Sequence, residues 1–76
     1  MSKEIAIRSD SIKLGQLLKL AGVIDGGGEA KTLLEHEQAL VNGEPESRRG
    51  RRLVPGDTVR LAGHDLLVVS AGSGGR

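Results

Sequence analysis

Four arginines lie within five consecutive positions, in the run Arg48-Arg49-Gly50-Arg51-Arg52. They are four of 11 basic residues in a chain that also carries 10 acidic residues and has a net charge of +1. Guanidinium groups at this density repel one another, so an anionic counterpart is expected. The planar donor fork of arginine fits two phosphate oxygens at once and stacks on flat rings. The run therefore predicts a site for a nucleic-acid backbone. The alternative interpretation is a solvated loop or a processing site, in which exposed charges contribute little to folding.

A glycine-rich stretch that ends in Lys31-Thr32 resembles a nucleotide-binding loop only superficially. The phosphate-binding pattern requires glycine directly before the lysine, where this chain has Ala30, and a strand rather than a helix leading in. A helix that starts after glycines still exposes backbone N–H groups to an anion. The backbone of Gly27 and Gly28 is therefore a candidate contact for one phosphate, and a plain turn between two helices is the alternative.

The remaining polar residues show no arrangement typical of catalysis or metal binding. His36 falls near the end of a predicted helix, where a cation is favoured, and His64 falls in a predicted turn. Glu44 and Glu46 flank Pro45 and are expected to be ordinary exposed acidic residues beside a turn. A catalytic site would need a nucleophile, an orienting partner and a cleft. We predict no enzymatic activity, no cofactor, no metal and no small-molecule substrate.

Composition limits both the size and the class of the protein. With 76 residues and no cysteine, the chain is expected to form one small domain over residues 1–71, held by aliphatic packing, followed by a flexible Gly/Ser tail over residues 72–76. It has no Phe, Tyr or Trp, which argues against RNA-recognition motifs and cold-shock domains, because these stack bases on aromatic rings. It shows neither a secretory signal nor an apolar run long enough for a membrane span, so we expect a cytoplasmic protein with no membrane partner.

The residue pattern predicts one strand, two helices and then several short antiparallel strands. Ile5 and Ile7 alternate with polar residues as in a half-buried strand, and Asp10-Ser11 is expected to cap a first helix that stops at Gly22. A second helix is predicted from Glu29 to about Glu37. The later strands are separated by turns at Asn42-Gly43, Pro55-Gly56-Asp57 and Gly63-His64. The expected core consists of Leu14, Leu17, Leu18, Ala30, Leu33, Leu34, Val41, Val59 and Leu61. This order of elements predicts an α+β domain.

Three of these motifs occur in a fixed order that resembles a known family. They are Glu29-Ala30-Lys31 at the second helix, Asn42-Gly43 after Leu40-Val41, and Pro55-Gly56-Asp57 before an alternating strand. Together, over about residues 12–61, they resemble the S-four-like RNA-binding domain, or alpha-L fold, named from small-subunit ribosomal protein four. The resemblance implies two short helices packed on a small twisted antiparallel sheet, with a basic face that grips structured RNA.

The resemblance also implies which residues would face RNA. Lys13 matches a basic position that opens the family's first helix, and Lys31 matches one in its second. The family often has a Ser-Arg pair where this chain has Gly26 and Gly27, so one expected contact is missing, and the arginine run could compensate for it. With no catalytic domain attached, the chain resembles the free-standing bacterial branch of the family, for which the implied role is binding alone.

Several functional hypotheses follow. The first is a stand-alone RNA-binding protein for stem-loop or duplex RNA, such as ribosomal or transfer RNA, with Lys13, Lys31, Arg48, Arg49, Arg51 and Arg52 on one anion-binding face. The second is an interaction module that docks an acidic protein surface through the arginines. DNA binding is a third hypothesis, weakened because the second helix carries Glu29, Glu35 and Glu37 rather than base-reading side chains. The sequence does not predict the oligomeric state.

Overall fold

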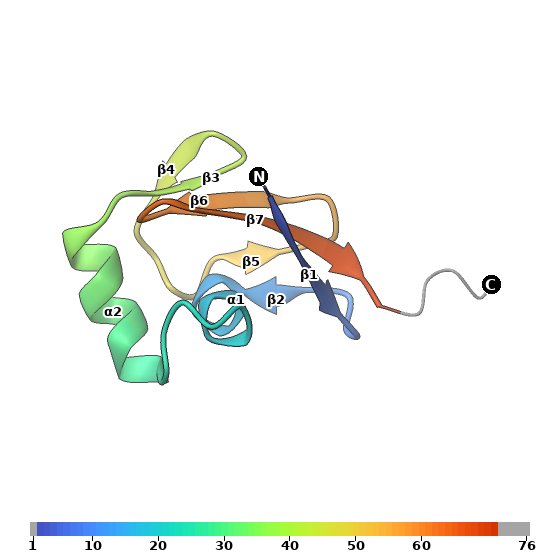
Figure 1. Ribbon diagram of the computed structural model, residues 1–76, viewed down its shortest axis with the longest axis horizontal. Helices are drawn as coiled ribbons and strands as arrows, with labels where there is room; N and C mark the ends of the chain where they lie inside the picture. The colour runs from blue at the N-terminus through green and yellow to red at the C-terminus, as the bar shows by residue number, and fades with distance from the viewer. Residues whose placement is uncertain (1, 72–76) are drawn as a thin grey trace.

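The computed structural model describes residues 2–71 and confirms the α+β fold class, with two short helices packed against a small sheet (Figure 1). The expected tail over residues 72–76 lies outside the described residues. In chain order the elements are β1 (Lys3–Ile7), β2 (Ile12–Lys13), α1 (Leu14–Leu20), α2 (Gly27–His36), β3 (Ala39–Val41), β4 (Glu44–Glu46), β5 (Arg52–Leu53), β6 (Thr58–Leu61) and β7 (His64–Ser70).

The main sheet has the strand order β1-β7-β6-β3-β4, and β2 pairs with β5 in a separate two-stranded ribbon. The prediction of a wholly antiparallel sheet is wrong at one edge, because β1 runs parallel to β7, with Lys3 opposite Leu66 and Ile7 opposite Ser70. A parallel pair needs a long crossover connection. Here both helices and five strands separate β1 from β7, so no tight turn forces these two strands to be antiparallel.

The helix boundaries differ from the predicted ones at their beginnings. Asp10-Ser11 does not cap α1, because β2 intervenes and extended Lys13 occupies the N-cap position without a side-chain cap. Helix α2 begins at Gly27 rather than Glu29 and ends at His36 rather than about Glu37. Gly22 ends α1 as predicted, with a φ of 79° that a side chain would disfavour.

The core lies between the helices and one face of the main sheet. All the predicted core residues are buried except Leu33, which is partly buried against the cluster. Further buried residues complete it: Ile5, Ile7, Ala21, Ile24, Ala39, Leu53, Leu66 and Val68. Ile5 and Ile7 reach this core because β1 alternates inward and outward residues, as their spacing predicted.

Two of the motifs behind the family resemblance are hydrogen-bonded to each other. Asn42 and Gly43 have consecutive positive φ values of 52° and 84°, as a tight hairpin turn requires. The Asn42 side chain donates to Asp57 Oδ1 at 3.0 Å, and its Oδ1 accepts from the Thr58 N–H at 3.0 Å. These hydrogen bonds therefore tie the turn after β3 to the start of β6. The last turn is centred on Ala62 and Gly63, and His64 begins β7 instead of lying in the turn.

Candidate nucleic-acid interface

The segment that we call the arginine loop, residues 47–52, runs from the end of β4 into β5 and rests on the start of α1. The Leu14 N–H donates to the Arg51 carbonyl at 2.8 Å, and the Gly15 N–H donates to the Arg49 carbonyl at 2.8 Å. These backbone bonds satisfy helix N–H groups that a side-chain cap would otherwise take. The arginine loop is therefore attached to the helix rather than freely solvated.

Gly15 allows three elements to meet closely at this point. A β-carbon on Gly15 would lie 3.3 Å from Cβ of Arg49 and 3.5 Å from Cβ of Ala30 in α2. The first distance is tighter than ordinary van der Waals contact, so a side chain here would push the arginine loop away from the helices. The absence of a side chain thus keeps Arg49 in the angle between α1 and α2.

Glu46 lies beneath the arginine loop and binds two of its arginines. Its carboxylate accepts from the Arg48 backbone N–H at 3.0 Å, from Arg48 Nε at 3.0 Å and Nη2 at 3.3 Å, and from Arg51 Nη1 at 2.9 Å. The Glu46 side chain is only 7% exposed. The hydrogen bonds from the Arg48 and then the Arg51 side chain lower the pKa of Glu46 from its usual 4.5 to about 2, so it stays ionised. The prediction that Glu46 is an ordinary exposed residue is wrong, because β4 directs it toward the protein interior.

Arg49 and Arg52 differ from the two paired arginines. Both are exposed, and within residues 2–71 neither side chain makes a hydrogen bond or ion pair. Arg52 pairs with Lys13 directly across the β2–β5 ribbon. Side chains opposite each other in an antiparallel pair have β-carbons about 4.5–5.5 Å apart, and like charges there repel. The ribbon therefore holds two cations together where an anion between them would relieve the repulsion.

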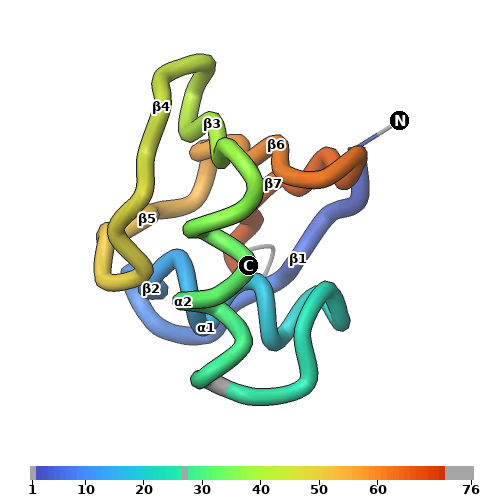
Figure 2. The backbone as a smooth tube through the Cα atoms, turned by 90° about the vertical axis from the view of Figure 1, so that its left-hand side faces the viewer, coloured from blue at the N-terminus to red at the C-terminus, as the bar shows by residue number. Residues whose placement is uncertain are grey.

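Arg49 lines two hollows, and lysine side chains line both of them as well. One hollow of about 240 Å³ is lined by Lys13, Gln16, Lys19, Arg49 and the backbone around them. The other, of about 560 Å³, is lined by Lys31, Leu34, Glu35, Ser47 and Arg49. The fold thus places Lys13, at the end of β2, and Lys31, in α2, in two hollows that share Arg49. Figure 2 shows β4, β5 and β2 on one side of the molecule and β1 on the other.

Gly28 lines neither of these two hollows, and a contact of the Gly27 backbone with phosphate stays a prediction. Gly27 is the first residue of α2, and Gly28 lines a different, largely apolar hollow with Val23, Ile24 and Leu33 among others. The start of α2 also has its own acidic residue, because Glu29 Oε1 accepts from the Asp25 N–H at 2.7 Å. A carboxylate at this position provides the negative charge that a helix N-terminus favours.

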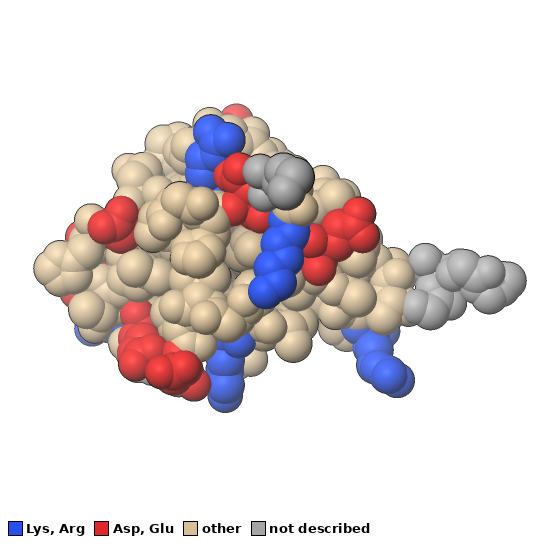
Figure 3. Space-filling view, in the orientation of Figure 1, with Lys and Arg blue, Asp and Glu red and all other residues tan. Residues whose placement is uncertain are grey.

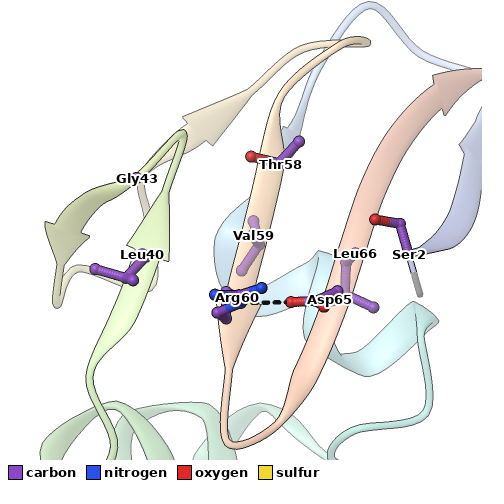
Figure 4. A pocket seen from close by; sticks show the side chains of 8 residues that line it. All are labelled: Ser2, Leu40, Gly43, Thr58, Val59, Arg60, Asp65 and Leu66. Atoms are coloured by element: carbon purple, nitrogen blue, oxygen red, sulfur yellow. Dashed lines mark hydrogen bonds and ion pairs between the residues drawn. The ribbon is translucent and has the colours of Figure 1, made fainter.

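Among residues 2–71, the positive charge on the opposite side of the molecule is more scattered. On the face shown in Figure 3, lysine and arginine side chains lie singly, most of them beside acidic residues. A hollow of about 270 Å³ on the sheet contains Arg60, but this arginine donates to Asp65 Oδ1 at 2.7 Å (Figure 4). The hydrogen bond from Arg60 lowers the pKa of Asp65, so the pair is neutral overall.

Sequence reasoning missed three residues of this region: Gln16, Lys19 and Glu46. Gln16 and Lys19 are three residues apart in α1, a spacing that could have indicated that they share a face of this helix. Glu46 had a weaker signal, because nothing local distinguishes it from exposed Glu44. Within residues 2–71, no group of three or more His, Cys, Asp or Glu residues could hold a metal ion. In the same range, no helix is both long and apolar enough to cross a membrane.

Comparison with known proteins agrees with this architecture. A model of the S4 domain matches residues 5–69. The "probable ribosome maturation protein RlbA" of Bacillus subtilis (strain 168) is 51% identical over 63 residues, which cover 83% of this chain and 89% of that protein. The "putative RNA-binding protein YbcJ" of Escherichia coli (strain K12) is 39% identical over 59 residues, covering 78% of this chain and 84% of that protein. The chain belongs to the S4 domain family.

Proposed function

We propose that this protein binds structured RNA through one side of the molecule, the basic face, and carries out no chemistry of its own. The basic face is defined by the arginine loop together with Lys13, Lys19 and Lys31. The observation that carries the proposal is the position of Arg49, which lines both the hollow with Lys13 and Lys19 and the hollow with Lys31. Cations from α1, α2 and the loop meet there, beside a second unpaired arginine opposite Lys13.

Membership of the S4 domain family and the printed names of the relatives favour RNA as the anion. One relative is named for ribosome maturation and another for RNA binding. These names support ribosomal RNA as the substrate class, ahead of transfer RNA. An isolated phosphate would engage only one part of a face built from three separate segments, whereas a nucleic-acid backbone offers several phosphates in a row.

Structured RNA is preferred in this proposal because the chain has no Phe, Tyr or Trp on which to stack unpaired bases. The cations are also held on hydrogen-bonded elements: Lys13 and Arg52 face each other across a ribbon, and the arginine loop is bonded to α1. A stem presents its phosphates in a fixed geometry that suits such a face. An unstructured strand would have to be ordered first, at an entropic cost.

The test is a titration of the protein with a ribosomal-RNA stem-loop and with poly-uridine of equal length, at one salt concentration. We expect tighter binding to the stem-loop and a slope of log affinity against log salt of about −0.7 to −0.9 per phosphate contact. Equal affinity for both RNAs would contradict the preference for structure.

An alternative is that the basic face docks an acidic protein. The two functions are separated by treating a complex isolated from lysate with ribonuclease. Dissociation under nuclease supports RNA binding, and a complex that persists supports a protein partner.

A further inference from the structure

Within the described residues, Glu46 is the one acidic residue whose carboxylate is hydrogen-bonded to the arginine loop, and its geometry differs from that of a surface ion pair. The carboxylate accepts four hydrogen bonds, three from Arg48 and one from Arg51. Its side chain is 7% exposed, whereas those of Arg48 and Arg51 are 76% and 35% exposed. The buried carboxylate therefore holds two arginine side chains whose remaining surfaces are still open to solvent.

The same carboxylate also fixes the loop backbone. The Arg48 N–H donates to Glu46 Oε2, and the Arg51 N–H donates to the Arg48 carbonyl at 3.2 Å, which closes a turn over Arg49 and Gly50. The carbonyls of Arg49 and Arg51 then accept from the first N–H groups of α1. Glu46 and α1 thus hold opposite sides of one turn, and Arg49 projects from the middle of it.

We infer that Glu46 is a positioning residue that preorganises the arginine loop for RNA, with Arg48 and Arg51 as its supports and Arg49 and Arg52 as the free ligand-facing arginines. This inference rests on the proposed function. A negative charge in a face that binds phosphates opposes binding by simple electrostatics. Its presence at this place is explained if the order that it imposes on four mutually repelling arginines outweighs the repulsion of RNA.

The direction of the change in RNA affinity on Glu46→Gln tests this role. Glu46→Gln removes one negative charge, and if Glu46 acted only through its charge, affinity for RNA would rise. If Glu46 positions the loop, affinity falls, because fewer molecules have the binding-competent conformation and the apparent affinity drops by that fraction. For a competent population reduced to about one tenth, the stem-loop binds about tenfold more weakly.

Glu44→Gln is the matched control. Glu44 lies on the same strand two residues away, is exposed, and gives the same change in net charge. The two variants are titrated with the ribosomal-RNA stem-loop at about 0.15 M salt, below their melting temperatures. We expect Glu44→Gln to bind as well as the parent or slightly better, and Glu46→Gln about tenfold more weakly. Equal or tighter binding by Glu46→Gln would overturn the inference while leaving RNA binding intact. Failure of the unaltered protein to bind the stem-loop would instead refute the proposed function.

A measurement on the unaltered protein covers the case in which Glu46→Gln does not fold. ¹⁵N relaxation of the arginine Nε–H groups reports side-chain motion on the picosecond to nanosecond timescale. In the free protein, we expect a high order parameter for Arg48 Nε, which donates to Glu46, and low values for Arg49 and Arg52. On addition of the stem-loop, Arg49 and Arg52 become ordered and Arg48 changes little. Equal mobility of Arg48 and Arg49 in the free protein would show that the loop is not preorganised and would overturn the inference.

Discussion

The two sides of the main sheet both carry arginines, but they use them differently. On the outer side, Arg60 faces one carboxylate, Asp65, in an exposed pair that leaves no excess charge. On the side covered by the helices, Arg48 and Arg51 share the single carboxylate of Glu46, whereas Arg49 and Arg52 have no partner within residues 2–71. An exposed one-to-one pair contributes little to stability and offers little to an anion.

The difference shows that the number of arginines is a poor guide to a binding site. The number of arginines that have no carboxylate partner is a better one. A carboxylate that is itself anchored can hold several guanidinium groups at fixed positions and still leave a net positive surface. Two backbone hydrogen bonds support the arginine loop on α1, and within residues 2–71 no equivalent bond joins the turn at Ala62 and Gly63 to a helix.

The largest expected effect concerns packing on the two sides. Leu17 of α1 is fully buried against the core, whereas Leu40 of β3 faces outward and is half-buried. Leu17→Ala should lower the free energy of unfolding by about 2 to 5 kcal/mol, because a cavity remains in the core. Leu40→Ala should cost about 1 kcal/mol or less. Urea denaturation of both variants measures this, and similar losses would mean that the helices do not cover the main core.

Arginine variants on the two sides test where the binding energy lies. Arg49→Ala combined with Arg52→Ala should weaken stem-loop binding about 10- to 100-fold and flatten the salt slope by about one to two units. The melting temperature should stay almost unchanged, since neither side chain has an intramolecular partner within residues 2–71.

Arg60→Ala is the control on the outer side and should leave both affinity and salt slope unaltered. A larger loss of affinity for Arg60→Ala than for the double variant would reverse the assignment of the two sides. Arg51 is not a neutral choice for such a test, because it is half-buried and donates to Glu46.

The pH dependence of stability should report the ionised carboxylate of Glu46. The pKa of Glu46 is lowered from 4.5 to about 2 in the folded protein, chiefly by its hydrogen bonds with Arg48. Its stabilisation is therefore complete above about pH 4.5 and is lost as the pH falls toward 2. At pH 7, the free energy of unfolding of the parent should exceed that of Glu46→Gln by on the order of 1 to 2 kcal/mol. This figure allows for solvent screening at the exposed Arg48 side chain. Thermal melts from pH 7 to 2 measure this difference, and a gap that stays constant over this range would contradict an ionic role.

The smallest effect is expected for a single lysine. Lys31→Ala should flatten the salt slope by about one unit, because one phosphate contact is lost. Lys3→Ala removes the same charge from β1, on the other side of the molecule, and should leave the slope unchanged. Equal flattening by both variants would mean that the protein acts only as a diffuse positive charge.

Much of the fold could be predicted because the information is local. The alternation of Ile5 and Ile7 with exposed residues, and the helical spacing of Leu14, Leu17 and Leu18, indicated which residues are buried. The parallel pairing of β1 with β7 was missed, since it depends on contacts between the two ends of the chain. Glu46 was missed for a similar reason, because its burial follows from which face of β4 meets the core.

The candidate site was predictable in part. The density of the arginines was visible in the sequence, and the family resemblance implied that Lys13 and Lys31 lie on one face with them. The unequal roles of the four arginines were not predictable, because these roles depend on a carboxylate two residues before the run and on the N-terminus of a helix more than thirty residues earlier. Contact of these residues with RNA stays a prediction.

The most direct test of the central claim is a chemical-shift map of the ¹⁵N-labelled protein titrated with the ribosomal-RNA stem-loop. We expect the largest backbone shifts at residues 13–19, at Lys31 and at residues 47–52, with little change around Leu40, Arg60 and Asp65. Shifts that concentrate on the outer side of the sheet, or spread evenly over both sides, would contradict it.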